Sequence, residues 1–202
     1  MEYDKDKKEI HFERDLNNLD KFVFDFVSLL DSYVLVSGYV SIINGRSRGT
    51  EDVDLLVPKM DLRDFEKLWK RLDENGFECL NTPKVEDAFE MLNEHAIRFA
   101  RKGKAVPNME FKLVGNGLGK YALENRIKLF LKDKMFWISP LELQIAYKLF
   151  LASDGTDEEL IQDKDIEDAR HLYKLFEDKI NNEEFLSFVR KLNKEKRLRF
   201  LE

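Results

Sequence analysis

Two aspartates one residue apart, Asp52 and Asp54, stand inside the apolar segment DVDLLV. Side chains two residues apart in a strand point to the same side, so a strand here brings both carboxylates together. Carboxylate oxygens bind hard cations such as Mg²⁺. Asp-x-Asp alone is more often a solvated strand end, but unpaired carboxylates beside buried strand residues are costly without a cation. The apolar neighbours therefore favour a site for Mg²⁺ or Mn²⁺, of the kind that supports phosphoryl or nucleotidyl transfer.

A turn of small residues, Ser37-Gly38, precedes this pair and follows the apolar segment that begins at Tyr33. A turn with little side chain that leads into a helix lets backbone N–H groups approach phosphate oxygens closely. Ser-Gly by itself is a common, ordinary turn. Its combination with Asp52 and Asp54 predicts that a divalent metal is held against the phosphates of a nucleoside triphosphate (NTP).

The loop between these two features carries Arg46, Arg48 and Thr50. Guanidinium groups match phosphate oxygens in geometry, so both arginines are candidates for nucleotide contacts. A solvated surface pair of arginines would have the same sequence. Thr50 is expected to fix the loop by bonding to the backbone, which is a structural role.

The order of these features resembles a known family. A strand, a Gly-Gly or Gly-Ser turn, a short helix and Asp-hydrophobic-Asp characterise the polymerase-beta-like nucleotidyltransferase superfamily, and this chain has SG at 37–38 and DVD at 52–54. The run RSRGTED from Arg46 resembles the approach to the aspartates in AbiE-type toxin nucleotidyltransferases and their bacterial and archaeal relatives. Ser37 replaces the usual glycine and bulky Tyr39 follows the turn, so the phosphate-binding turn departs from the pattern.

The resemblance implies transfer of a nucleoside monophosphate from an NTP, such as ATP, to a hydroxyl group. Asp52 and Asp54 would be catalytic metal ligands, and Glu110 in NMEFKLVG is the best counterpart of the superfamily's third carboxylate. Glu110 would serve as the base or as a further metal ligand, although an exposed glutamate alternating with Lys112 is an equally ordinary reading. The implied acceptor is RNA (tRNA), a protein or a small molecule, and a toxin would have a cognate antitoxin. The alternative is a catalytically silent nucleotide-binding or protein-interaction module of the same fold.

Two later segments, LELQIAYK and KDIEDA, also resemble motifs of the AbiE-type group, so the resemblance spans about residues 33 to 176. It implies that Lys148, Asp165 and Asp168 line the nucleotide pocket, and it also draws attention to Glu142 and Lys164. Lys148 stands among apolar residues, and a buried lysine needs an acidic partner such as Asp165 or Asp168. An internal salt bridge explains the same residues without any nucleotide.

Helices and strands interleave along most of the chain. Apolar spacing predicts helices from Asp15 and from Asp61 to Gly76, and everything beyond Pro140 reads as helical. The predicted strands include YVLVS, DVDLLV, AIRFAR, NMEFKLVG and a hairpin of IKLFLKD with KMFWIS. We therefore expect an α+β (mixed α/β) fold, with a nucleotidyltransferase-like mixed sheet and flanking helices over residues 1–139 and a helical C-terminal part over residues 140–202.

The composition of the 202 residues fits a globular chain with a formal net charge of −6. A single cysteine, Cys79, excludes an internal disulfide framework and a Cys-rich zinc site. The net charge argues against a molecule that binds nucleic acid through an overall basic surface, and leaves room for local positive patches. No apolar run approaches the roughly 18 residues of a membrane span, and the N-terminus is too charged for a signal peptide, so we expect a cytoplasmic location without membrane contact.

Overall fold

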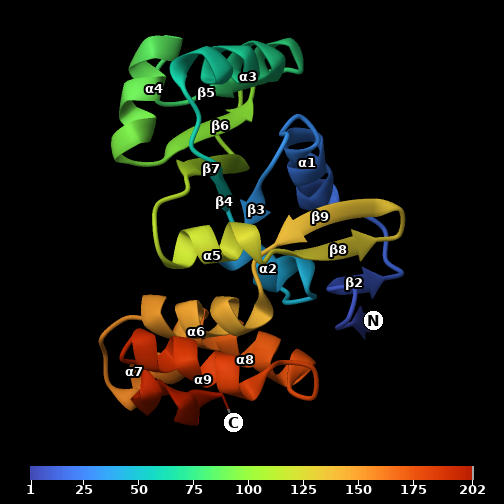
Figure 1. The fold of residues 1–202 in the computed structure, drawn as a ribbon, viewed down its shortest axis with the longest axis vertical. Coiled ribbons are helices and arrows are strands. Elements are labelled where there is room, and N and C mark those ends of the chain that lie inside the picture. Colours follow the sequence, from blue (N-terminus) through green and yellow to red (C-terminus); the bar gives the residue numbers. More distant parts are fainter. Residues whose placement is uncertain (202) are drawn as a thin grey trace. The chain divides into compact units, whose positions relative to one another are not determined.

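A computed structural model describes residues 1–201. Strands and helices interleave up to residue 138, and helices follow (Figure 1). The strands are β1 (Glu2–Asp4), β2 (Glu9–Phe12), β3 (Val34–Leu35), β4 (Asp52–Val57), β5 (Phe77–Cys79), β6 (Ile97–Arg101), β7 (Asn108–Leu113), β8 (Ile127–Leu131) and β9 (Lys134–Ile138). The helices are α1 (Asn18–Val27), α2 (Gly38–Ile43), α3 (Leu62–Glu74), α4 (Val85–Glu94), α5 (Leu118–Glu124), α6 (Leu141–Leu151), α7 (Asp157–Ile161), α8 (Lys164–Phe176), α9 (Asn182–Lys191) and the 3-10 helix η1 (Glu195–Phe200).

The strands form a nine-stranded sheet in the order β1-β2-β8-β9-β3-β4-β7-β6-β5. Three neighbouring pairs are parallel, namely β2 with β8, β3 with β9 and β4 with β7, and the other neighbours are antiparallel. The sheet is therefore mixed. The expected fold class, a mixed sheet with flanking helices and a helical C-terminal part, is confirmed.

The chain forms two compact units. The first, here called the sheet unit, comprises Met1–Val36 and Gly49–Ile138 and contains every strand together with α1, α3, α4 and α5. The second, here called the helical unit, comprises Ser37–Arg48 and the described chain from Ser139 onward, so α2 belongs with the C-terminal helices. The domain roles expected from the sequence for residues 1–139 and 140–202 stay predictions.

A core of aromatic and aliphatic side chains stabilises the sheet unit. Val53 and Leu55 of β4 are fully buried, and they alternate with half-buried residues along the strand. Phe26 of α1 contacts Phe99 and Phe111 with ring centroids 5.8 and 6.5 Å apart. Burial of such large apolar side chains contributes about 1.5–3 kcal/mol each. The core therefore packs α1 against β6 and β7, and β7 is the strand that pairs with β4.

The helix from Leu62 to Glu74 begins and ends where its sequence predicts. The Asp61 side chain accepts a hydrogen bond from the backbone N–H of Asp64 at 2.9 Å, which satisfies one donor of the first turn. Gly76 follows the helix with a φ of 80°, a left-handed conformation that glycine adopts without strain. Capping at both ends explains the sharp limits of α3.

In the helical unit, α6 packs against both α8 and α9 (Figure 1). Apolar residues of α6 such as Leu143, Ile145 and Leu149 are buried, as expected for a helix covered on several sides. Arg197 of η1 is also buried and donates to the carbonyl oxygens of Leu149 and Ala152 at 2.6 and 2.8 Å. These bonds satisfy carbonyl groups that a helix end leaves unpaired. Arg197 thus supplies an internal cap for the end of α6.

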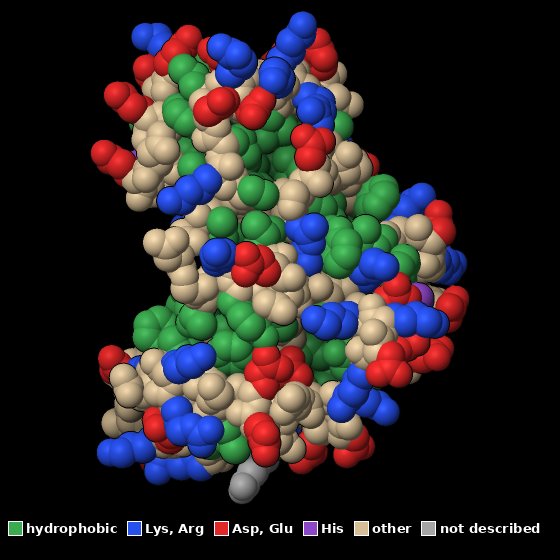
Figure 2. All heavy atoms as spheres, in the orientation of Figure 1, with side chains coloured by type: hydrophobic (Ala, Val, Ile, Leu, Met, Phe, Trp, Pro, Cys, Tyr) green, Lys and Arg blue, Asp and Glu red, His purple; other side chains and the backbone are tan. Residues whose placement is uncertain are grey.

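Acidic and basic side chains are interspersed over the face drawn in Figure 2. This mixture agrees with the small net charge relative to the 74 charged residues, 34 basic and 40 acidic. None of the helices within residues 1–201 has the length and apolarity that crossing a membrane requires.

Candidate functional site

The aspartate pair lies on one face of β4. Asp52 and Asp54 are half-buried and alternate with the fully buried Val53 and Leu55. The alternation follows from the two-residue period of a strand, which sends the apolar side chains into the core and both carboxylates to the other side. Both carboxylates therefore lie on one side of β4, and their convergence on a metal ion stays a prediction.

The neighbouring strand β7 adds two polar residues to this face. In the parallel register, Asp52 pairs with Asn108 and Asp54 with Glu110. Asn108 and Glu110 alternate with the buried Met109 and Phe111, so both face the same side of the sheet as the aspartates. Asp52, Asp54, Asn108 and Glu110 are together called the carboxylate face below. The third candidate carboxylate, Glu110, thus stands beside Asp54 on the adjacent strand.

Two cations contact the Glu110 carboxylate. Its Oε1 lies 3.1 Å from Lys112 Nζ, and its Oε2 lies 3.3 Å from Arg98 Nη2. Both cationic side chains are about half exposed, whereas the Glu110 side chain is only 17% exposed. Such pairs are screened by solvent and contribute little to stability. Their effect at this position is to offset part of the negative charge that gathers on the carboxylate face.

Thr50 orders the start of β4. Its hydroxyl donates to the backbone oxygen of Asp52 at 2.8 Å and lies 3.3 Å from Oδ1 of the same residue. The bond to backbone is the role that the sequence predicted for Thr50. It restricts the residue that carries the first of the two candidate metal ligands.

The donors on the carboxylate face are of the type that Mg²⁺ or Mn²⁺ prefers, since all of them are oxygen atoms. Within residues 1–201, however, there is no group of three or more His, Cys, Asp or Glu side chains that could hold a metal ion. A carboxylate triad of Asp52, Asp54 and Glu110 is therefore not assembled in this structure. Metal binding by these residues stays a prediction.

The Ser37-Gly38 turn belongs to the helical unit, where Gln144 of α6 holds it. The Ser37 N–H donates to Gln144 Oε1 at 3.1 Å, and Gln144 Nε2 donates to the Ser37 carbonyl oxygen at 2.8 Å. Ser37 has a φ of 59°, which is unusual for a residue with a side chain. Gln144 was not predicted from the sequence, because nothing marks a buried glutamine on an apolar helix as the partner of a distant turn.

Gly38 is needed for a close approach. A Cβ atom at this position would lie 2.3 Å from Arg48 Nη2, inside van der Waals contact. The Arg48 guanidinium is itself held by Asp168 Oδ2 at 2.8 Å. The small residue that the sequence associated with phosphate binding therefore also makes room for an arginine of the same unit.

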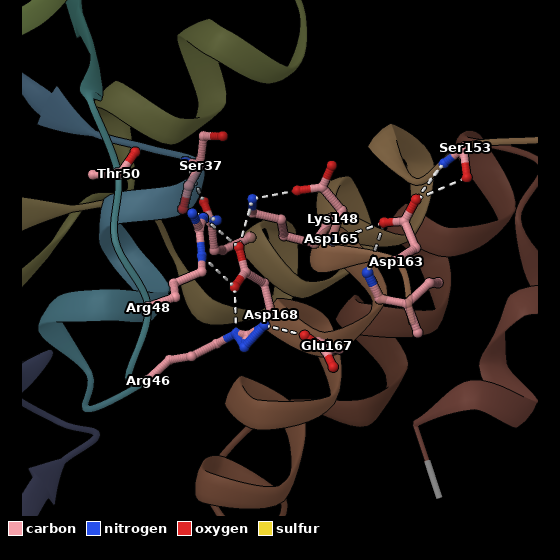
Figure 3. A network of polar contacts seen from close by, with 12 residues as sticks. Ser37, Arg46, Arg48, Thr50, Lys148, Ser153, Asp163, Asp165, Glu167 and Asp168 are labelled. Carbon is pink, nitrogen blue, oxygen red and sulfur yellow. Dashed lines mark hydrogen bonds and ion pairs between the residues drawn. The ribbon is translucent and has the colours of Figure 1, made fainter. Parts of the chain in front are cut away.

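Arg46 and Arg48 converge on Asp168 of α8, as Figure 3 shows. Arg46 Nε lies 2.7 Å from Asp168 Oδ1, and a further nitrogen of Arg46 contacts Glu167. Arg48 donates to both oxygens of Asp168, from Nε at 3.0 Å and from Nη2 at 2.8 Å. The side chain of Asp168 is fully buried, so these two arginines compensate a charge that has lost its water.

Lys148 of α6 completes this network. Its ammonium group lies 2.6 Å from Asp165 Oδ1 and 2.8 Å from Asp168 Oδ2, and its side chain is only 2% exposed (Figure 3). The acidic partners are those that the sequence proposed for a buried lysine. This arrangement is the internal salt bridge foreseen as one interpretation, and nucleotide contacts of Lys148, Asp165 and Asp168 stay a prediction.

Asn108 is a residue that the sequence analysis missed. It stands two positions before Glu110, as Asp52 does before Asp54, so the two-residue period could have placed it on the same face. What could not be foreseen is the pairing of Asn108 with Asp52, because the register of two strands 50 residues apart in the chain depends on tertiary packing.

Comparison with known proteins gives a structural likeness only. No protein-family model matches the chain, and no curated protein matches it. The crystal structure of ANT(2″)-Ia in complex with adenylyl-2″-tobramycin aligns over 86% of this chain and 95% of that chain, with a TM-score of 0.52 at 10% sequence identity. An antigenic nucleotidyltransferase-like protein from Paracoccidioides brasiliensis aligns over 88% of this chain and 87% of its own, with a TM-score of 0.49 at 18% identity. By its likeness to the first of these structures, the chain has a nucleotidyltransferase-like fold.

Proposed function

We propose that this chain is a metal-dependent nucleotidyltransferase that moves a nucleoside monophosphate from an NTP to a hydroxyl group. The observation that supports this most directly is the placement of Asp52 and Asp54 on one face of β4, with Glu110 as the register partner of Asp54. The nucleotidyltransferase-like fold adds to it. An AbiE-type toxin with a cognate antitoxin is the finer version of the proposal, based on the sequence resemblance alone.

In this proposal Asp52 and Asp54 hold Mg²⁺ or Mn²⁺. The bound cation would supply activation of the attacking oxygen and neutralisation of charge on the departing pyrophosphate. The chain's own contribution is position, because a strand packed against a core keeps both carboxylates on one side. Glu110, on the same face, would receive the proton of the acceptor hydroxyl. Thr50 would restrict Asp52 through its two oxygen contacts.

In the helical unit, we propose that the Ser37-Gly38 turn contacts phosphate oxygens. Arg46, Arg48 and Asp168 would then act as positioning residues, because they hold the loop after α2 to α8 through buried ion pairs. The two Gln144 bonds restrict Ser37 of the turn itself. Pre-ordering a binding turn lowers the entropy lost when a ligand binds.

The acceptor is one of three classes: RNA such as tRNA, a protein side chain or a small molecule. The ligand in the matched ANT(2″)-Ia structure, adenylyl-2″-tobramycin, supports testing ATP first as donor and aminoglycosides among the small molecules. The toxin version predicts that expression of the chain arrests bacterial growth and that the product of a neighbouring gene relieves the arrest. Growth unaffected by expression would remove the toxin version and leave the enzyme proposal standing.

A catalytically silent nucleotide-binding or protein-interaction module of the same fold is the second candidate. It is favoured by the contacts of Glu110 with Arg98 and Lys112, since a carboxylate engaged by two cations is less available as a base or a metal ligand. The module predicts Mg²⁺-dependent NTP binding without release of pyrophosphate. A protein-interaction role alone predicts no NTP binding.

One experiment separates these candidates. The protein is incubated with each α-³²P-labelled NTP and Mg²⁺ in the presence of total RNA, cell lysate or an aminoglycoside panel, and transfer of label and release of pyrophosphate are measured. Asp54→Asn is compared with Asp31→Asn, which removes the same charge from a side chain that is 92% exposed. We expect transfer with the wild type and Asp31→Asn but not with Asp54→Asn. Equal transfer by both variants would exclude the proposed role of Asp54.

A further inference from the structure

One polar atom on the carboxylate face has no partner. Asn108 is 7% exposed, and its side-chain oxygen Oδ1 is buried without any hydrogen bond. Within residues 1–201, two other buried side-chain atoms share this state, on Ser41 of α2 and on Asn44 directly after α2, and both residues belong to the helical unit. Asn108 is therefore the member of this group that stands beside Asp52.

The orientation of the Asn108 amide follows from its other contacts. Its Nδ2 donates to the backbone oxygen of Glu51 at 3.2 Å and of Ala105 at 3.4 Å. Carbonyl oxygens accept hydrogen bonds and cannot donate them, so the amide nitrogen must occupy this side and the oxygen the other. The unpaired atom of the Asn108 amide is therefore its acceptor oxygen, Oδ1.

A buried carbonyl oxygen without a partner is destabilising, and such atoms are rare in folded proteins. Replacing Asn108 by an apolar residue would remove that cost, so its presence calls for a physical reason. An ion or a water molecule bound at this position would supply the missing partner.

The position of Asn108 indicates which ligand this would be. Asn108 and Asp52 are register partners in adjacent parallel strands, which lie about 4.7–4.9 Å apart, and both face the side that also carries Asp54. The described residues offer no cluster of three His, Cys, Asp or Glu side chains for a metal ion, and Glu110 already contacts two cations. A third protein ligand next to the aspartates would therefore be of another type. Asn side-chain oxygens are established ligands of hard divalent cations.

We propose that Asn108 Oδ1 is the third protein ligand of the divalent cation that Asp52 and Asp54 bind, an inference that rests on the proposed function. Two carboxylates and one neutral amide carry two negative charges, which one divalent cation balances. Glu110 then remains free of the cation's first coordination shell and keeps its ion pairs with Arg98 and Lys112. This division leaves Glu110 as a base rather than a ligand.

The test measures Mn²⁺ binding to the nucleotide-free protein by the loss of the electron paramagnetic resonance signal of free Mn²⁺. Asn108→Asp keeps an oxygen at the position, adds a negative charge and loses the Nδ2 bonds. Asn108→Leu loses the oxygen and the bonds together. Because affinity follows the charge and number of ligands, we expect Asn108→Asp to bind Mn²⁺ about 10-fold more tightly than wild type and Asn108→Leu about 10-fold more weakly.

Asn125→Asp is the matched control, since Asn125 also lies in the sheet unit and donates from Nδ2 to a backbone oxygen, that of Tyr121, at 3.1 Å. It adds the same charge and loses a similar bond at a residue that is not part of the carboxylate face, so we expect unchanged Mn²⁺ affinity. Thermal melting identifies variants that do not fold. If Asn108→Leu fails to fold, Asn108→Asp alone decides the outcome.

Three results would overturn the inference. If both Asn108 variants bind Mn²⁺ with the affinity of wild type, Oδ1 is not a ligand. If both variants bind Mn²⁺ equally more weakly, Oδ1 is again not a ligand and only the Nδ2 bonds matter. If Asn108→Asp binds Mn²⁺ no more tightly than Asn125→Asp, Oδ1 is likewise not a ligand. If wild type binds Mn²⁺ no better than the double variant Asp52→Asn with Asp54→Asn, the proposed function fails as well. If the double variant weakens Mn²⁺ binding and the Asn108 variants do not change it, the proposed function stands.

Discussion

Asp54 of β4 and Glu110 of β7 are register partners in adjacent parallel strands, and both side chains lie on the carboxylate face. The pairing brings two negative charges to neighbouring positions, with Asp52 two residues away. Lys112 and Arg98 contact the Glu110 carboxylate at 3.1 and 3.3 Å. A divalent cation held by the two aspartates would offset the negative charge that gathers on this face.

Replacing Glu110 by Gln keeps the shape of the side chain and removes its charge. If Glu110 receives the acceptor proton, nucleotide transfer falls about 10²- to 10⁴-fold. The free energy of unfolding changes by less than about 1 kcal/mol, because the partners Lys112 and Arg98 are about half exposed. Transfer is measured with saturating NTP and stability by urea unfolding.

The control for Glu110→Gln removes its partners instead. Lys112→Met and Arg98→Met each break one ion pair and leave the carboxylate in place. We expect both to retain most of the transfer activity. Activity lost equally in all three variants would mean that the ion pairs, and not the carboxylate as a base, are what the reaction needs.

Thr50 is predicted to tune metal affinity without touching the metal. Its hydroxyl donates to the Asp52 backbone oxygen and lies 3.3 Å from the carboxylate of Asp52. Groups that orient a ligand in this way typically affect metal affinity about 10- to 100-fold. Thr50→Val, which loses the hydroxyl and keeps the shape, should weaken Mn²⁺ binding about 10-fold, whereas Thr50→Ser should not. Unchanged affinity in Thr50→Val would assign the hydroxyl to loop structure alone.

Gly38 and Arg48 should be energetically coupled. An alanine at Gly38 would place a Cβ 2.3 Å from Arg48 Nη2, and Asp168 holds this guanidinium in place. Overpacking of this kind costs about 1–3 kcal/mol. In an Arg48→Ala background the same Gly38→Ala change should cost less, because the obstructing atom is gone. Urea unfolding of the four proteins gives the coupling energy, expected at about 0.5–3 kcal/mol; additive effects would mean that the guanidinium moves aside freely.

Local patterns predicted the elements that carry the site. The alternation in DVDLLV predicted β4 and the shared face of Asp52 and Asp54, and the caps of Asp61 and Gly76 predicted the limits of α3. These features depend on the period of a strand or on bonds within a few residues, so a sequence contains them directly. The hairpin of IKLFLKD with KMFWIS was predicted for the same reason, and it is formed by β8 and β9.

Features that depend on distant pairing were not predicted. The short strands β1 and β2 carry charged residues and little apolar alternation, and they exist because backbone groups of Glu9–Phe12 pair with β8. The two arginine partners of Asp168 illustrate the same limit. Its burial beside an arginine loop arises from packing of α2 against α8, which no local pattern contains. The Gln144 bonds to Ser37 and the pairing of Asn108 with Asp52 belong to this class as well.

Asp163, the N-cap of α8, should make stability depend on pH. Burial acts to raise the pKa of Asp163, but hydrogen bonds from Ser153, Asp165 and Ile166 outweigh it and lower the pKa below its ordinary value of 3.8. The unfolded chain keeps the ordinary pKa, so between the two values it binds more protons and stability rises with pH. The stabilisation by the ionised carboxylate is therefore present above pH 3.8 and is lost as the pH falls through the folded pKa.

Asp163→Asn isolates this charge, because asparagine also caps helices well. We expect the variant to be less stable than wild type by about 0.3–1 kcal/mol at pH 7, where the carboxylate interacts favourably with the helix N-terminus. The difference should shrink below pH 3.8. Urea unfolding of both proteins at several pH values between 3 and 7 measures it, and a difference independent of pH would contradict the assignment.

Asp168 and Glu167 are neighbours on α8 that both contact Arg46, yet their side chains are 0% and 44% exposed. Asp168→Asn would leave Arg46, Arg48 and the buried Lys148 around a neutral group, and uncompensated buried charge costs about 3–5 kcal/mol. Glu167→Gln removes the same charge at a solvated position and should cost less than about 1 kcal/mol. Urea unfolding followed by circular dichroism compares the two variants. The loss of stability in Asp168→Asn comes from buried cations that have lost their carboxylate partner, so Lys148→Met should restore part of the stability in that background. Equal small losses in Asp168→Asn and Glu167→Gln would show that the buried network adds no stability.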